Sequence, residues 1–146
     1  EYIKDEEFFF FTYGDGLGDI DITESMKFHK KHGGLATVTV SSPPGRFGTI
    51  QKNVNSLVTS FNEKPINEGG LINAGFFVLS PRVLDYIEGD NISWEIDPLE
   101  KLVKEKELFS FEHSGFWHPM DTLRDKNLLQ NLWDNNKAPW KKWSKT

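Results

Sequence analysis

Phe8-Phe9-Phe10-Phe11-Thr12-Tyr13-Gly14-Asp15-Gly16 is the stretch that decides the fold, because it joins a continuous apolar run to a tight polar turn. A short run of this kind is typical of a strand buried on both faces. Helix signals follow, since Asp21 and Glu24 can form a capping box and Gly33-Gly34 can end the helix. Residues 35–40 are rich in β-branched side chains and predict a second strand. Strand, helix and strand in this order indicate a parallel crossover and the α/β class.

The rest of the chain continues to alternate between strand and helix patterns. Residues 47–51 and 57–61 predict a hairpin, and the apolar run over 71–79 predicts the most deeply buried strand. We therefore expect a mixed, mainly parallel sheet flanked by helices, in one domain that covers residues 1–146. The remaining expected elements are a helix after Ser80-Pro81, a helix after Asp97-Pro98 with Leu99, Leu102 and Val103 on one face, a strand over 108–111, and a helix after Thr122 with a stripe of Leu128, Leu129, Leu132 and Trp133.

Composition narrows the class of protein. The 146 residues include twelve Phe and five Trp, which favours a folded domain with a substantial core. A net charge of −5 argues against a nucleic-acid partner, and the chain has no apolar run long enough to span a membrane. With no cysteine and no signal peptide, we expect a soluble, cytoplasmic protein. The chain starts at Glu1 without methionine, so we expect it to be part of a longer protein.

Two carboxylates follow apolar segments and are the main candidates for chemistry. Asp15 follows the first strand, and Asp121 lies in Phe116-Trp117-His118-Pro119-Met120-Asp121-Thr122-Leu123-Arg124-Asp125, where an apolar segment meets a helix start. Acidic side chains at strand ends suit a divalent metal beside a nucleotide. Structural roles remain open for both, because Asp between glycines is common in turns and Asp121 can cap the helix, in competition with Thr122 and Asp125.

Both acidic motifs, together with three others, resemble the glucose-1-phosphate cytidylyltransferase family of sugar nucleotidyltransferases. The other three are Gly45-Arg46-Phe47-Gly48, Phe61-Asn62-Glu63-Lys64-Pro65 and Ala138-Pro139-Trp140-Lys141, and the resemblance runs from about Phe8 to the C-terminus. It implies the C-terminal part of the nucleotide-diphospho-sugar transferase (Rossmann-like) fold. It also implies that Asp15 and Asp121 bind Mg²⁺.

The same resemblance implies roles for a second set of residues. Glu63 would hold sugar hydroxyls, and Lys64 would neutralise the sugar phosphate as the catalytic lysine. Gly48, Asn73 and Gly75 would contact the sugar. The residues themselves leave other readings open: Glu63 and Lys64 can be a solvated surface pair, Asn73 a hydrogen-bonded core residue, and the glycines close-packed strand positions.

Substrates and partners follow from the resemblance as expectations. It implies that CTP and glucose 1-phosphate give CDP-glucose and pyrophosphate, in nucleotide-sugar biosynthesis for lipopolysaccharide O-antigen, by a homo-oligomer. The family binds triphosphate on a glycine-rich loop followed by arginine, and the sequence has no such loop, so we expect the isolated chain to be inactive. A non-catalytic sugar-phosphate-binding module or a glycosyltransferase-like domain remains open.

Histidines are not expected to bind a metal. His29 and His32 lie three residues apart on what reads as an exposed, lysine-rich helix, and His113 and His118 show no ligand spacing. We therefore expect structural or solvated roles for them.

Overall fold

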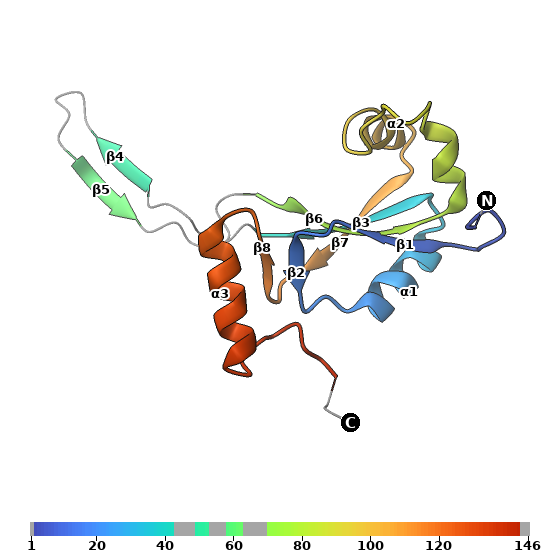
Figure 1. Ribbon diagram of the computed structural model, residues 1–146. Helices are drawn as coiled ribbons and strands as arrows, with labels where there is room; N and C mark the ends of the chain where they lie inside the picture. Colours follow the sequence, from blue (N-terminus) through green and yellow to red (C-terminus); the bar gives the residue numbers. More distant parts are fainter. Residues whose placement is uncertain (1, 43–48, 53–57, 63–69, 144–146) are drawn as a thin grey trace.

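A four-stranded sheet forms the centre of the molecule in the computed structural model, which describes residues 2–42, 49–52, 58–62 and 70–143 (Figure 1). The strand order is β1 (Phe9–Thr12), β6 (Ile72–Leu79), β3 (Ala36–Ser41) and β7 (Leu108–His113). β6 is antiparallel to both β1 and β3, whereas β3 is parallel to β7. β1, β3 and β7 therefore run in one direction and β6 in the other. The expected mixed sheet is confirmed, with one parallel pair, β3 with β7, and two antiparallel pairs.

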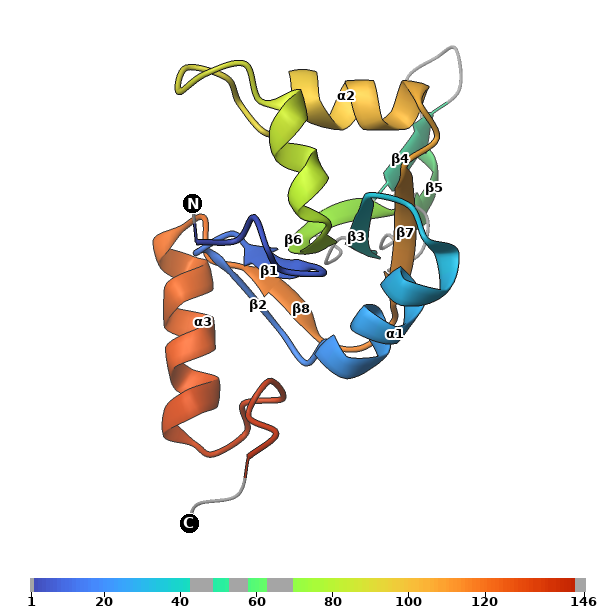
Figure 2. The ribbon, with the colours of Figure 1, turned by 90° about the vertical axis from the view of Figure 1, so that its right-hand side faces the viewer.

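Helices cover both faces of this sheet (Figure 2). α1 (Ile22–His32) packs on one face, and the 3-10 helix η1 (Pro81–Tyr86) and α2 (Asp97–Lys104) lie on the other. The crossover predicted from β1 through α1 to β3 is present, but β6 lies between its two strands. The layers bury one apolar cluster, made by Leu35, Ala36, Val38, Phe77, Leu79, Val83 and Leu102.

The ends of α1 follow the sequence signals closely. The Asp21 carboxylate accepts a hydrogen bond from the Glu24 amide at 2.9 Å, and Gly33 ends the helix at φ 70°. The expected capping box is only half formed, because the Glu24 carboxylate pairs with Lys27 at 2.7 Å. Ser80 caps η1 as predicted, since its side chain accepts from the Arg82 amide.

Two expectations about burial and one about a helix cap are wrong. The run over 8–11 is not buried on both faces, because β1 is an edge strand and Phe10 is 50% exposed. In α2, Asp97 is the first helical residue rather than the cap, which is Ile96 and makes no side-chain bond. Leu102 is fully buried as expected, but Val103 is 60% exposed, although α2 packs against η1 and β7.

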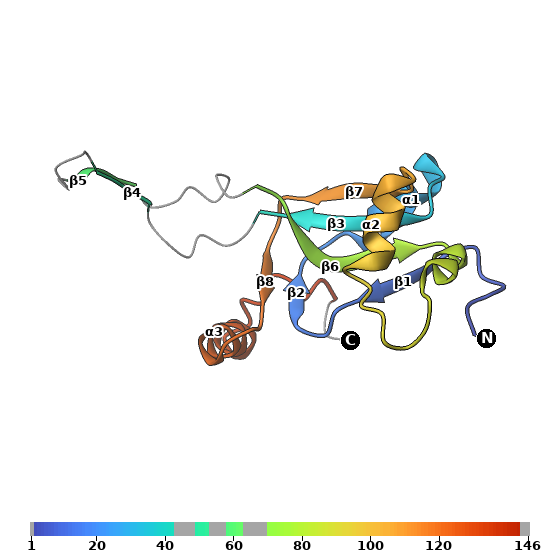
Figure 3. The same ribbon diagram turned by 90° about the horizontal axis from the view of Figure 1, so that it is seen from above.

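A separate two-stranded ribbon lies beside the four-stranded sheet and is followed by the C-terminal helix (Figure 3). It is formed by β2 (Gly16–Gly18) and β8 (Trp117–Pro119), which pair antiparallel, and it leads into α3 (Leu123–Asp134). The predicted stripe of α3 is only partly buried, since Leu129 is 3% exposed but Leu128 and Trp133 are each 45% exposed. The predicted hairpin is also found, as β4 (Thr49–Lys52) and β5 (Val58–Asn62), and its turn lies outside the described residues.

A largely buried series of hydrogen bonds joins α1 to β3. The expectation that His29 and His32 lie on an exposed helix is therefore wrong. The Gly34 amide donates to His32 Nδ1 at 2.9 Å, which leaves the His32 proton on Nε2 to bond Thr37 Oγ1 at 2.7 Å. The Thr37 hydroxyl can then donate to His29 Nδ1 at 2.9 Å. Burial lowers the pKa of His29 to about 4, with the neighbouring His32 adding to the effect. Both imidazoles are therefore neutral structural groups at neutral pH.

Candidate metal and sugar-phosphate site

The ribbon brings the two candidate metal ligands to the same end of one short ladder. Gly16 pairs with Pro119, and the Met120 amide extends the ladder by donating to the Asp15 carbonyl at 2.6 Å. Asp15 thus lies opposite Met120, the residue that precedes Asp121. Both aspartates are exposed at this end of the ribbon. Residues more than a hundred positions apart in the sequence have become neighbours through strand pairing.

Asp121 is not the cap of α3. The cap is Thr122, whose hydroxyl accepts from the Asp125 amide at 3.2 Å, while Asp125 Oδ2 accepts from the Thr122 amide at 3.1 Å. This reciprocal capping box satisfies the first turn of the helix without the Asp121 carboxylate. The structural alternative for Asp121 as a helix cap is therefore wrong, and its carboxylate lies just outside the helix start.

β6 carries two candidate sugar contacts, Asn73 and Gly75, and bonds to both acid-bearing segments. The Tyr13 amide donates to the Gly75 carbonyl at 2.9 Å, and Trp117 Nε1 donates to the Ala74 carbonyl at 2.9 Å. Asp15 follows Tyr13 by two residues, and Asp121 follows Trp117 by four. Residues 73–75 therefore hold the two ends of the candidate metal site against the main sheet.

Gly75 has a clear structural reason to be glycine. Its φ is +77°, and a Cβ built there would lie 2.8 Å from Cδ2 of the Tyr13 ring. The β3–β6 register also shifts here, between the pairs Val38 with Phe77 and Val40 with Asn73. Asn73 supports the irregularity, because its Oδ1 accepts from the Gly75 amide at 2.8 Å. Its side chain is exposed rather than buried in a core, contrary to one of the open readings.

Tyr13 links the candidate sugar residue to the loop before α2. Its hydroxyl accepts from Asn73 Nδ2 at 3.3 Å and bonds the Glu95 carboxylate. Burial, the bond to Glu95 and the nearby negative charges of Glu95 and Asp15 together raise the pKa of Tyr13 to about 12. The phenol therefore keeps its proton at neutral pH, so it can donate to Glu95 while accepting from Asn73.

A second polar cluster fastens the C-terminal tail to the far end of the ribbon. Lys142 Nζ lies 3.1 Å from Asp19 Oδ2, and the Asp19 amide donates to the Phe116 carbonyl at 3.0 Å. Burial opposes ionisation of Asp19, but the hydrogen bond and charge of Lys142 outweigh it, so the pKa of Asp19 lies below its ordinary value. His113 Nε2 is 3.1 Å from Asp19 Oδ1, yet only its 3.0 Å contact to Phe116 O has hydrogen-bond geometry.

Four of the predicted site residues thus meet in one region, namely Asp15, Asn73, Gly75 and Asp121. Gly48, Glu63 and Lys64 lie outside the described residues, so their roles remain predictions. Within the ranges that the structure describes, no three His, Cys, Asp or Glu side chains are grouped to hold a metal. A pair of carboxylates nevertheless suits Mg²⁺, which commonly takes one or two protein carboxylates and fills its remaining positions with water and substrate phosphate oxygens.

Sequence reasoning missed the residues that position this region. Trp117, His118 and Tyr13 each make a hydrogen bond that holds an acid-bearing segment. The only sequence signal for these roles was that three aromatic residues lie close to Asp15 or Asp121 in the chain. Tryptophan and tyrosine usually find a partner for their polar atom when they are partly buried. The identity of that partner depends on the fold.

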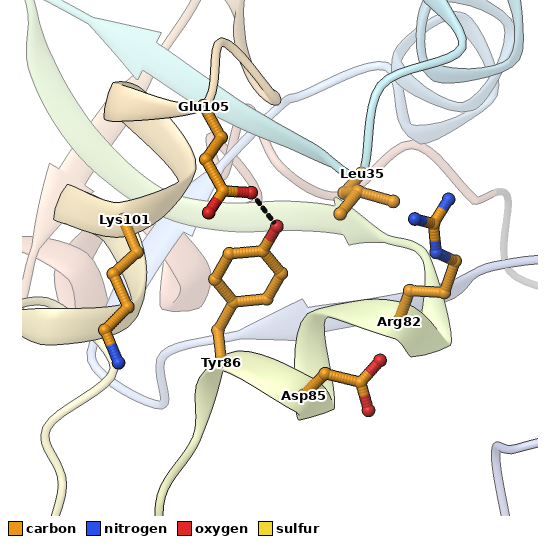
Figure 4. Close-up of a pocket in the computed structure, with 6 residues that line it drawn as sticks. All are labelled: Leu35, Arg82, Asp85, Tyr86, Lys101 and Glu105. Atoms are coloured by element: carbon orange, nitrogen blue, oxygen red, sulfur yellow. Dashed lines mark hydrogen bonds between the residues drawn. The ribbon is translucent and has the colours of Figure 1, made fainter.

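Two depressions lie near these elements. One, of about 320 Å³, lies between α3 and the ribbon and is lined mainly by Leu17, Met120, Leu129, Trp133 and Trp140. The other, of about 310 Å³, lies between η1 and α2, where Tyr86 donates to Glu105 and Arg82 and Asp85 lie along η1 (Figure 4). Of the predicted site residues, none of the four that the structure describes (Asp15, Asn73, Gly75 and Asp121) lines either depression. No helix in the described part of the chain is long and apolar enough to cross a membrane.

Residues 1–127 match the family model described as nucleotidyl transferase, so the chain belongs to that family. The putative glucose-1-phosphate thymidylyltransferase of Bacillus anthracis, solved with a sucrose, has the same fold, with a TM-score of 0.61 at 18% identity over 98% of this chain and 58% of its own. HddC from Yersinia pseudotuberculosis, solved with GMP-PN, gives a TM-score of 0.60 at 18% identity, covering 88% of this chain and 56% of its own.

Among its relatives, the chain is similar to glucose-1-phosphate cytidylyltransferases. It is 54% identical to the enzyme of Salmonella typhimurium over 143 residues, which are 98% of this chain and 55% of that protein. It is 39% identical to the probable glucose-1-phosphate cytidylyltransferase of Bacillus subtilis, across 98% of this chain and 56% of that protein. The chain thus spans about half the length of the curated relatives it matches. The resemblance stated from the motifs is confirmed.

Proposed function

We propose that this chain is the sugar-phosphate- and metal-binding part of an enzyme that makes CDP-glucose and pyrophosphate from CTP and glucose 1-phosphate. The observation that carries the proposal is the pairing of β2 with β8, which sets Asp15 and the residue before Asp121 opposite each other. The 54% identity to a relative named for this reaction supports the choice of cytidylyl transfer.

In the proposed reaction, an oxygen of the sugar phosphate attacks the α-phosphorus of CTP in line. The new P–O bond forms as the bond to the β-phosphate oxygen breaks, and pyrophosphate leaves with the electron pair. Catalysis of this kind depends on positioning and on neutralising the charges of the phosphates. Bound Mg²⁺ would supply much of that neutralisation at Asp15 and Asp121.

Side chains of this chain would bind the sugar and neutralise its phosphate. Lys64 would neutralise the sugar phosphate as a point charge, and Glu63 would accept hydrogen bonds from sugar hydroxyls. Asn73 and Gly75 would contact the sugar. Asn73 is exposed and fixed through Tyr13 and the Gly75 amide, which supports its role as a preorganised contact.

Metal binding tests the site in the chain itself. Mn²⁺ is titrated as a paramagnetic stand-in for Mg²⁺, and the free ion is measured by EPR. We expect Asp15→Asn and Asp121→Asn each to weaken binding at least about tenfold while changing the free energy of unfolding little, because each removes ligand charge rather than packing. Asp85→Asn, an exposed aspartate on η1, is the matched control. Equal affinity in all four proteins would remove the metal site from the proposal.

The sugar-phosphate half is tested with ligand titrations of glucose 1-phosphate. Lys64→Ala should weaken its binding while leaving CTP binding in the whole protein nearly unchanged, and Glu63→Ala should reduce discrimination among sugar phosphates. If both variants bind glucose 1-phosphate like the unchanged protein, these residues are a surface pair.

Pyrophosphate release from CTP, compared with UTP, GTP and dTTP, tests the choice of base in the whole protein. Binding without release from any nucleotide would favour a non-catalytic module.

A further inference from the structure

His118 makes a contact that spans the segment containing Asp121. Its Nε2 lies 3.0 Å from Asp125 Oδ1, and both side chains are nearly buried, with exposed fractions of 13% and 10%. Because an ionised carboxylate can only accept, the imidazole donates through Nε2. This contact, which we call the His118–Asp125 bridge, connects the middle of β8 to the first turn of α3.

The His118–Asp125 bridge adds to the hydrogen bonds that hold the very short connection between β8 and α3. Only Met120 and Asp121 lie between the end of β8 and the helix cap Thr122. The strand side is held by the Met120 amide, which bonds the Asp15 carbonyl at 2.6 Å. The helix side is held by the capping box between Thr122 and Asp125. The bridge ties the two sides directly to each other across Asp121.

Asp125 therefore has a second role besides helix capping. Its Oδ2 accepts from the Thr122 amide at 3.1 Å and the Thr122 hydroxyl at 2.8 Å, while its Oδ1 accepts from His118. A buried carboxylate needs such donors, because burying a charge is costly unless it is hydrogen-bonded. The donor on Oδ1 comes from β8, so the charge is best satisfied when β8 and α3 keep one relative position.

His118 is itself held in place. It lies opposite Leu17 in the β2–β8 ladder, and its ring stacks with Phe116 at a centroid separation of 6.4 Å. A ligand must keep its position within a fraction of an ångström for a metal to bind well, and supporting residues commonly provide that precision. We propose that the His118–Asp125 bridge makes His118 a positioning residue, which holds Asp121 in register with Asp15 for a divalent metal. This inference rests on the proposed function.

The test replaces the His118 imidazole with an aromatic ring that cannot donate a hydrogen bond. In His118→Phe we expect about a tenfold weaker Kd for Mn²⁺ and faster hydrogen exchange at the Met120 amide, with the far-UV circular dichroism unchanged. His118→Gln supplies an amide N–H of similar reach and should restore most of both properties. His118→Leu is measured beside these variants, so that a folding defect in one still leaves a comparison. His29→Phe is the matched control, since it removes a buried histidine on α1 and should alter neither readout beyond its effect on global stability.

The outcomes separate this inference from the proposed function. If the Met120 amide exchanges at the same rate in His118→Phe and the unchanged chain, the bridge does not position this segment and the inference is overturned. If exchange accelerates in His118→Phe and not in His29→Phe, the bridge is supported, even where Asp15→Asn and Asp121→Asn show that no metal binds here. Faster exchange with an unchanged Mn²⁺ affinity would reject the link from the bridge to the metal.

Discussion

Acidification should weaken the fold through the buried imidazole of His29. This side chain is 6% exposed and its Nδ1 lies 2.9 Å from the Thr37 hydroxyl. Burial, with the adjacent His32, lowers the pKa of His29 from 6.5 to about 4, while Glu7 opposes the shift. Between these two values the unfolded chain binds more protons than the folded chain. The free energy of unfolding therefore falls as the pH falls from 7 toward 4.

The size of the effect follows from the two pKa values. At pH 5 the unfolded imidazole is almost fully protonated, whereas about a tenth of the folded imidazole is. With pKa values of 6.5 and about 4, the free energy of unfolding should drop by about 2 kcal/mol between pH 7 and pH 5. Burial also lowers the pKa of His32, so its contribution has the same sign. Most carboxylates titrate below this window, so we assign its pH dependence mainly to His29 and His32.

Urea unfolding at pH 7, 6 and 5 measures this drop. In His29→Asn the amide oxygen takes the place of Nδ1, so it can still accept from the Thr37 hydroxyl but cannot titrate. The variant should be less stable at pH 7 because it loses packing, yet its free energy of unfolding should change much less between pH 7 and pH 5. Parallel pH curves for the two proteins would refute the reasoning. An NMR titration that finds His29 protonated near pH 6.5 in the folded chain would do the same.

Other predictions concern single residues and the chain as a whole. Gly75→Ala should destabilise the fold by about 1–3 kcal/mol in thermal unfolding, because φ is +77° and the new Cβ would meet the Tyr13 ring; an unchanged Tm would contradict this. Thr122→Ala should cost about 1 kcal/mol in urea unfolding through loss of the cap, and a loss near zero would show that the capping box is dispensable. The isolated chain should release no pyrophosphate from CTP and glucose 1-phosphate, because its sequence lacks the glycine-rich, arginine-bearing loop; sustained turnover would overturn this. It should also self-associate in sedimentation, since Phe10 on the edge strand β1 is 50% exposed, and a monomer at high concentration would argue against it.

Local signals in the sequence determined the elements and several of their ends. Asp21, Ser80 and Thr122 were each expected at a helix start, and each accepts a hydrogen bond from an amide two or three residues ahead. Such caps involve only near neighbours, so the same few residues carry both the signal and the interaction. The strand patterns were equally local, and the mixed sheet flanked by helices followed from their order.

Which strands pair, and what surrounds each side chain, depended on the tertiary structure. The sequence predicted the strand over 71–79 but not its place between β1 and β3. The exposure of Phe10 and the burial of His29 depended on which elements cover each face, and local patterns are the same in either case. A run of four phenylalanines cannot reveal whether its strand lies at the edge of a sheet.

For the candidate site, the sequence supplied the chemistry and the tertiary structure supplied the geometry. Two aspartates after apolar segments were enough to suggest a divalent metal, because hard oxygen ligands at strand ends are informative by themselves. Their approach depends on the β2–β8 pairing, on Trp117 bonding the Ala74 carbonyl, and on His118 bonding Asp125. The first two join residues separated by long stretches of chain, and all three form only when the packing of the whole fold offsets the entropy of ordering the chain. No local pattern encodes them.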